Sequence, residues 1–143
     1  MRLTRVTVLP ALCLMLASCG GTPGTINGNW AATLSGTETV NGDVPITIGF
    51  TVTLNQTSPP DVNATNFTIT AAPNSCFTGA TLSATFSGGA FSLKIATAPG
   101  PFQNVLNLQG NLDGSTIKGT WTSLGGASEL ECTASGTYKM TKS

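Results

Sequence analysis

Ionisable side chains are scarce in this sequence, and their scarcity excludes several kinds of function. The 143 residues contain no histidine, and charged residues make up 8% of the chain. Without histidine, neither a Ser–His–Asp triad nor a Cys–His pair can form. No glycine-rich run has the spacing of a phosphate-binding loop either. We therefore predict a protein that is not an enzyme and that needs no cofactor.

The basic residues are few and unevenly placed. Both arginines, Arg2 and Arg5, lie at the start of the chain, and residues 19–143 carry four lysines and six carboxylates, a formal charge of minus two. A nucleic-acid-binding protein needs a basic patch to neutralise phosphates. The composition therefore predicts neither a nucleic-acid partner nor a basic surface for anionic lipids. With no histidine and so few thiols, it predicts no metal site.

The first 18 residues have the composition of a secretory signal. Arg2 and Arg5 supply the positive start, and an apolar run of about 11 residues extends from Val6 to Leu16. A membrane-spanning helix needs roughly 20 apolar residues, so this run is too short to span a bilayer. We expect residues 1–18 to be removed as a signal peptide.

The residues at the expected cleavage point are Leu16-Ala17-Ser18-Cys19. This tetrapeptide resembles the lipobox of bacterial lipoproteins, in which the signal is cut before the cysteine and the thiol receives a diacylglycerol. The resemblance implies that Cys19 is the lipidation site and that its lipid attaches the protein to a membrane. The alternative is an ordinary secreted protein, cut near Ala17, in which Cys19 is a spare thiol.

The same resemblance implies a location in the bacterial cell envelope. Gly20 is not the aspartate that retains some lipoproteins at the inner membrane, so the outer membrane is implied for a host with two membranes. Residues 19–25 are rich in glycine and threonine without apolar periodicity, which is typical of a flexible tether. The remaining residues, 26–143, are enough for one small domain.

Apolar and polar residues alternate along most of this domain, and a period of two is typical of strands with one buried face. No segment has a convincing helical period. The alternating segments are residues 26–34, 46–55, 67–71, 82–86, 91–95, 106–112, 117–121 and 132–140. In the third of them the buried face is expected to hold Phe67, Ile69 and Ala71. The pattern predicts a single all-β domain of about eight strands.

Turn signals separate the alternating segments. Gly88-Gly89, Asp113-Gly114 and Asn41-Gly42 favour tight hairpins, since these residues tolerate positive φ. Pro59-Pro60 marks a loop, because proline cannot donate to a strand ladder. Strands joined by such turns form an antiparallel meander, and closure into an up-and-down barrel removes its edges. A two-sheet β-sandwich is the alternative.

One spacing occurs twice, because residues 26–30 and 117–121 share the pattern I-x-G-x-W. An inward glycine leaves room for an indole to lie across the sheet. Gly28-Asn29-Trp30 resembles the opening strand of lipocalins and of avidin-type barrels. In lipocalins an arginine from the last strand covers that tryptophan, and here Lys139 or Lys142 is the candidate replacement.

The barrel interpretation leads to a tentative ligand site. Trp30, Trp121 and Tyr138 are aromatic residues expected on inward faces, where they would contact a ligand held inside the barrel. The alternative is that these side chains are parts of a filled core.

Cys76 and Cys132 are expected to form a disulfide. Cys13 is removed with the signal and Cys19 takes the lipid, which leaves an even pair in an oxidising compartment. In a meander, alternate connections lie at the same end. Cys76 lies in the third connection and Cys132 follows the seventh, so both are predicted at the end opposite to the tether.

Two hypotheses about function follow. The first is a membrane-anchored envelope lipoprotein that acts as a non-catalytic binding module for a small apolar ligand or an envelope partner. The second is a structural, interaction or inhibitor lipoprotein with a filled core, which presents its distal loops and binds no small molecule. Glu129 and Glu131 would share one face and can bind a cation, but such a pair is usually solvated surface.

Overall fold

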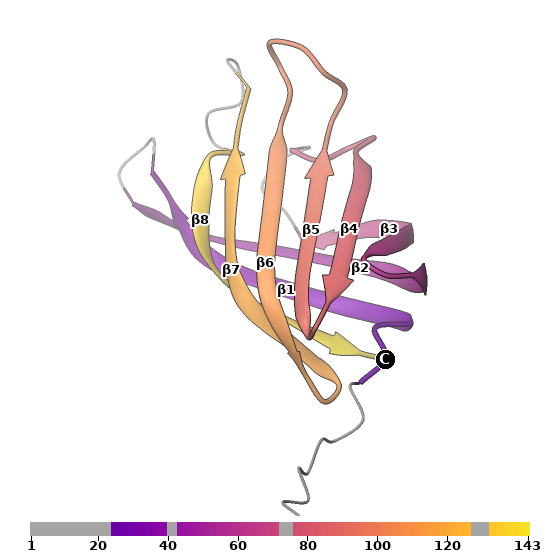
Figure 1. Ribbon diagram of the computed structural model, residues 1–143. Helices are drawn as coiled ribbons and strands as arrows, with labels where there is room; N and C mark the ends of the chain where they lie inside the picture. Colours follow the sequence, from indigo (N-terminus) through magenta and orange to yellow (C-terminus); the bar gives the residue numbers. More distant parts are fainter. Residues whose placement is uncertain (1–23, 40–42, 72–75, 127–131) are drawn as a thin grey trace, which may run out of the picture.

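The chain forms a closed antiparallel barrel whose strands follow one another in sequence order, as the computed structural model shows (Figure 1). The structure describes residues 24–39, 43–71, 76–126 and 132–143. The strands are β1 (Gly28–Glu38), β2 (Val44–Ser58), β3 (Asp61–Ala71), β4 (Thr81–Ser87), β5 (Ala90–Ala96), β6 (Val105–Asp113), β7 (Thr116–Leu124) and β8 (Ala134–Lys142). The predicted eight-stranded barrel is confirmed, and the sandwich alternative is wrong.

β1 and β8 close the barrel. They pair antiparallel from Trp30 opposite Lys142 to Glu38 opposite Ala134. Because the strand number is even and neighbouring strands alternate in direction, the first and last strands run in opposite directions and can share an antiparallel ladder. β1–β3 cross behind β4–β7 at a steep angle, so the inward faces of the two layers meet in one core (Figure 1).

Two of the expected hairpin turns lie within the described residues. Gly88 and Gly89 have φ of 58° and 88°, as a tight turn between β4 and β5 requires. The turn between β6 and β7 lies one residue later than expected, because Asp113 pairs with Thr116 and Gly114 takes the first turn position with φ of 59°. Asn41-Gly42 lies outside the described residues.

The buried faces of the strands are those that the alternation predicts, except on β3. On β2, the five alternating residues from Ile46 to Leu54 are at most 9% exposed. The same holds for the alternating positions of β5, where Phe91, Leu93 and Ile95 are at most 2% exposed and Lys94 is on the outer face. Burial of these apolar side chains is the main favourable contribution to folding.

β3 departs from simple alternation because it contains a bulge. Asn66 has φ of 52°, and the pairing with β2 shifts register there. Val62 is buried before the shift, whereas Phe67 and Ile69 are partly buried after it. A second shift follows Ile69, so Ala71 does not continue the inward series and is exposed. The expectation that Ala71 is buried was wrong.

The ladder is thinnest between β3 and β4. In the described part of the chain these strands pair at two positions, Asp61 opposite Thr85 and Val62 opposite Ala84. Phe77, in the connection between them, is 2% exposed and packs into the core. The barrel is therefore closed at this seam by side chains as well as by its ladder.

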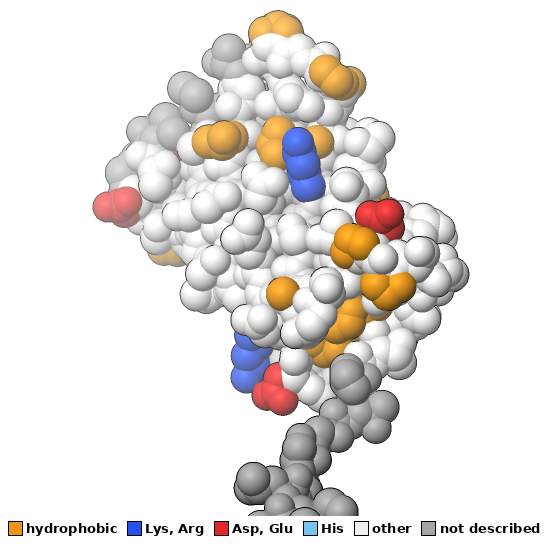
Figure 2. Space-filling model, viewed as in Figure 1, with side chains coloured by type: hydrophobic (Ala, Val, Ile, Leu, Met, Phe, Trp, Pro, Cys, Tyr) orange, Lys and Arg blue, Asp and Glu red, His pale blue; other side chains and the backbone are white. Residues whose placement is uncertain are grey.

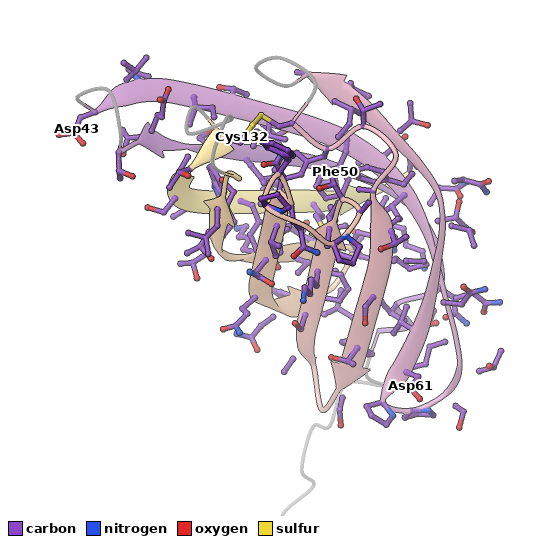
Figure 3. The ribbon with its side chains drawn as sticks, turned by 90° about the horizontal axis from the view of Figure 1, so that it is seen from above. Asp43, Phe50, Asp61 and Cys132 are labelled. Carbon is purple, nitrogen blue, oxygen red and sulfur yellow. A yellow bond between two sulfur atoms is a disulfide. The ribbon has the colours of Figure 1, made fainter. Side chains whose placement is uncertain are left out.

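The barrel has two distinct ends. At the proximal end, where the N-terminal segment enters, Ile26 is buried and its carbonyl oxygen accepts a 2.7 Å hydrogen bond from Trp30 Nε1. The opposite, distal end carries the connections β3–β4, β5–β6 and β7–β8 (Figure 1). Seen from above, Cys132 lies beside the interior in which Phe50 is packed (Figure 3). Within the described ranges, no helix has the length and apolar character needed to cross a bilayer.

Candidate functional site

The three aromatic residues proposed as ligand contacts belong to one hydrophobic core. Trp30 and Trp121 are each 1% exposed, and Tyr138 is 4% exposed. Each of them lines a different hollow of the outer surface. The structure therefore brings them together as core residues and does not gather them around a common hollow.

Both indoles have partners for their N–H groups. Trp30 donates to Ile26, as described above, and Trp121 Nε1 donates to the carbonyl oxygens of Ser35, at 3.3 Å, and Thr137, at 3.1 Å. The space for the Trp121 indole comes from Gly36 on β1, because a Cβ there would lie 2.8 Å from Trp121 Cζ2. The glycine within the I-x-G-x-W repeat is not what accommodates this ring.

The Tyr138 hydroxyl lies against another glycine. A Cβ on Gly110 would stand 2.5 Å from the Tyr138 oxygen, so only glycine leaves room for the phenol. This hydroxyl is buried and has no hydrogen-bond partner among the described residues. Burial raises the pKa of Tyr138 far above its ordinary value, because the phenolate would be desolvated.

Of the two lysines proposed to cover Trp30, Lys142 is the one that lies beside the opening strand. It lies opposite Trp30 on the neighbouring strand, and its side chain passes over Gly28, where a Cβ would lie 2.6 Å from Lys142 Cε. Lys142 Nζ donates to the carbonyl oxygen of Thr25 at 3.4 Å. Lys139 points outward from β8 and is exposed.

The distal end of the barrel holds the disulfide and several buried side-chain hydrogen bonds. We call the described residues there, 76–80, 97–104, 124–126 and 132–133, the distal rim. The expected disulfide between Cys76 and Cys132 is present, with Cα atoms 5.8 Å apart. It joins the β3–β4 connection to the segment before β8, which confirms the prediction that both cysteines lie at the same end.

A buried asparagine ties the remaining connections of the distal rim together. Asn104 is 3% exposed, and its Nδ2 donates to the carbonyl oxygen of Cys76 at 2.7 Å. Its Oδ1 accepts from the backbone N–H of Gly126 at 2.8 Å, and its own N–H donates to Thr97 Oγ1 at 2.8 Å. Through two buried side-chain hydrogen bonds, Asn104 therefore joins the β5–β6 connection, to which it belongs, to the β3–β4 and β7–β8 connections.

Ser123 ties the end of β7 to the residues at the start of β8. Its hydroxyl donates to the carbonyl oxygen of Cys132 at 2.6 Å and accepts from the N–H of Ala134 at 3.1 Å. Sequence reasoning missed both Asn104 and Ser123. Ser123 had a signal, since it is a polar residue at an inward position of an alternating run, but nothing in the sequence distinguished Asn104.

Large apolar side chains project from this tied structure into solvent. Phe102 is 61% exposed and Leu124 is 62% exposed. Leu124 is the last residue of β7, and the connection that follows it touches the β5–β6 connection that carries Phe102, because a Cβ on Gly126 would lie 2.5 Å from Phe102 Cα. Figure 2 shows apolar side chains at this end, over the loop between β5 and β6. Two large apolar side chains are therefore exposed on a part of the barrel that buried hydrogen bonds and the disulfide tie together, and exposed apolar side chains of this kind make the distal rim a candidate binding surface.

The remaining candidate residues, Cys19 with its lipobox and the pair Glu129 and Glu131, lie outside the described residues. Comparisons of the chain with protein families, with curated proteins and with solved structures found no match.

Proposed function

We propose that this chain is a lipid-anchored lipoprotein of the bacterial cell envelope whose barrel binds an envelope protein through the distal rim and catalyses no reaction. The lipobox supports the anchor, since Cys19 would carry the lipid and residues 19–25 would act as the tether. The chain enters the barrel at the proximal end, beside Ile26. The distal rim would then face away from the membrane, where a partner can reach it.

The observation that carries the proposal is the pairing of exposed apolar side chains with a rigid frame. Phe102 and Leu124 are 61% and 62% exposed. The connections beside them are nevertheless held in place by the hydrogen bonds of Asn104, and the disulfide joins two neighbouring parts of the rim. A surface that is already ordered loses little conformational entropy when it binds. An aromatic anchor such as Phe102 is typical of the residues that dominate binding energy.

The packing of the interior favours a protein partner over a small apolar ligand held inside the barrel. Phe50, Phe86 and Phe91 from three strands are all at most 8% exposed and belong to the same core as the tryptophans. Gly110 and Gly136, which would otherwise leave space, are closely approached by Tyr138 and by the backbone of β1. The filled-core hypothesis is therefore the better supported of the two.

The test is site-specific photo-crosslinking in the native host. A photoreactive residue at position 102 is expected to give one discrete crosslinked protein, whereas the same residue at Thr51, an exposed position on β2, is not. Phe102→Ser with Leu124→Ser should abolish the crosslink made from a third rim position, Gln103, without lowering the thermal midpoint. Equal crosslinking from positions 51 and 102 would exclude the distal rim as the binding surface.

The anchor is tested separately. Cys19→Ser should leave an unprocessed precursor without lipid, detectable by mass spectrometry and by detergent partitioning. A Cys19→Ser protein of mature size that still partitions into detergent would contradict the lipobox assignment. That result would not test whether the distal rim binds a protein.

A further inference from the structure

A groove crosses the outer face of the barrel, on the wall formed by β4–β8 and β1. It consists of two adjoining hollows of about 580 Å³ and about 460 Å³, and Lys118 and Gly119 line both. Gly110 and Gly119, opposite each other on β6 and β7, form part of its floor. This surface is separate from the distal rim.

Two rows of outward-facing residues border the groove, and the strand register aligns them. The first row contains Ser92, Gln109, Thr120, Thr137 and Ser35. The second row contains Ala90, Asn111, Lys118, Lys139 and Thr33. Each row crosses five strands, which at about 4.8 Å between strands is roughly 19 Å. All of these side chains except that of Ala90 can form hydrogen bonds, so the groove suits an elongated polar ligand.

The second row places two positive charges side by side. Lys118 on β7 lies directly opposite Lys139 on β8, and both are exposed. Like charges at directly opposite positions destabilise a sheet. Asp113 lies on the same face of β6, two residues beyond Asn111, but among the described residues no ion pair joins it to either lysine. An anion bound between the two ammonium groups would remove their repulsion.

We propose that this groove binds an acidic oligosaccharide, with Lys118 and Lys139 contacting a carboxylate or phosphate of the ligand. The hydroxyls and amides of Gln109, Asn111 and Thr120 both donate and accept hydrogen bonds, as sugar hydroxyls do. Phe91 and Tyr138, the aromatic residues that line the groove, are 2% and 4% exposed, so they offer no face on which a nucleic-acid base could stack. The site rests on neither the lipid anchor nor the distal rim.

The same chemistry occurs in a soluble acidic glycan and in the headgroup of a membrane glycolipid, so the experiment has two arms. Residues 19–143 carrying Cys19→Ser are titrated with linear oligogalacturonate in one arm. In the other they are titrated with phosphatidylcholine vesicles that contain a ganglioside, a glycolipid whose oligosaccharide headgroup carries a sialic acid carboxylate. Amide NMR of Gly110, Gly119 and Lys118 reports binding in the first arm, and co-sedimentation reports it in the second. Binding in either arm supports the proposal and identifies the source of the ligand.

The variants separate this groove from general attraction to positive charge. Lys118→Gln and Lys139→Gln should each weaken binding about tenfold, and added salt should weaken binding to the wild type. Lys94→Gln removes an exposed lysine on the outer face of β5 that does not line the groove, and it should leave binding unchanged. The thermal midpoints of Lys118→Gln and Lys139→Gln should not fall, since each removes a like-charge contact.

Three results would overturn the proposal. They are an absence of binding in both arms, equal binding of the uncharged chain cellotetraose, and a loss of affinity in Lys94→Gln as large as that in Lys118→Gln.

Discussion

Gly36 on β1 lies directly opposite Gly136 on β8, so close that a Cβ on Gly136 would stand 2.5 Å from Gly36 Cα. The same Cβ would overlap the carbonyl oxygen of Ser35, and a Cβ on Gly36 would overlap that of Ser135. The indole of Trp121 packs into the space that Gly36 leaves. The ladder that closes the barrel therefore depends on two residues that have no side chain.

Gly136→Ala is expected to destabilise the protein by about 1–3 kcal/mol, because backbone atoms of β1 must move to admit the methyl group. Urea denaturation measures the change. Ser135→Ala alters the exposed side chain of the neighbouring residue and should change stability by less than about 0.5 kcal/mol. If the two variants were equally stable, close approach of β1 and β8 would not be what requires glycine.

Tyr138→Phe should leave stability unchanged or raise it by about 1 kcal/mol, because it removes a buried hydroxyl that has no partner in the described structure. Tyr138→Ala is the matched contrast, since it also removes the ring and should cost about 3–5 kcal/mol. Equilibrium unfolding of the three proteins gives both differences. A clear loss of stability in Tyr138→Phe would reveal an ordered water or another partner for the hydroxyl.

Alkaline pH should unfold the protein through the same residue. Burial raises the pKa of Tyr138 in the folded state, so at high pH the unfolded chain binds fewer protons than the native one. The contribution of Tyr138 to the free energy of unfolding is constant below the ordinary tyrosine pKa of about 10. It then falls by about 1.4 kcal/mol per pH unit until the pH reaches the raised pKa of the folded state.

The measurement of this alkaline effect is direct, because Tyr138 is the single tyrosine in the chain. Tyrosinate absorbance should appear together with loss of the circular dichroism of the strands, and Tyr138→Phe should weaken the dependence of stability on alkaline pH. Tyrosinate absorbance near pH 10 in a protein that is still folded would show that the phenol is accessible.

Reduction of the disulfide should lower the thermal midpoint by about 10 °C or more. Cys76 and Cys132 are separated by 56 residues, and closing a loop of that length in the unfolded chain is worth about 4 kcal/mol. Thermal melts of the oxidised protein, the reduced protein and the Cys76→Ala, Cys132→Ala double variant measure the effect. In residues 19–143 carrying Cys19→Ser, which lack Cys13, thiol titration after denaturation should detect two thiols only when reductant has been added.

Asn104→Ala should destabilise the protein by about 2–4 kcal/mol, because it leaves the carbonyl oxygen of Cys76 and the N–H of Gly126 without their present partner. Hydrogen exchange should then accelerate at Gly126 and in the β5–β6 connection. Asn107→Ala, at a partly exposed position of β6, is the control and should do neither. Unchanged protection in Asn104→Ala would mean that the disulfide alone holds the distal rim.

The pairing of particular residues across strands could not be predicted from the sequence. Alternation placed Lys118 and Lys139 on outer faces, but only the register brings them opposite each other. The composition indicated no basic surface, and the structure gathers two of its few lysines in one groove. Likewise, the I-x-G-x-W repeat suggested that a glycine makes room for Trp121, yet the glycine that does so lies on β1.

The sequence by itself determined the strand number, the turn between β4 and β5, the all-β class and the partner of each cysteine at the distal end. These features depend on local alternation, on the φ tolerance of Gly88 and Gly89, and on the alternating direction of a meander. The tertiary structure decided the register, the bulge at Asn66 and the role of Asn104, because each depends on contacts between residues far apart in the chain. A strand's own pattern fixes which face is buried, whereas packing against its neighbours fixes which residues meet.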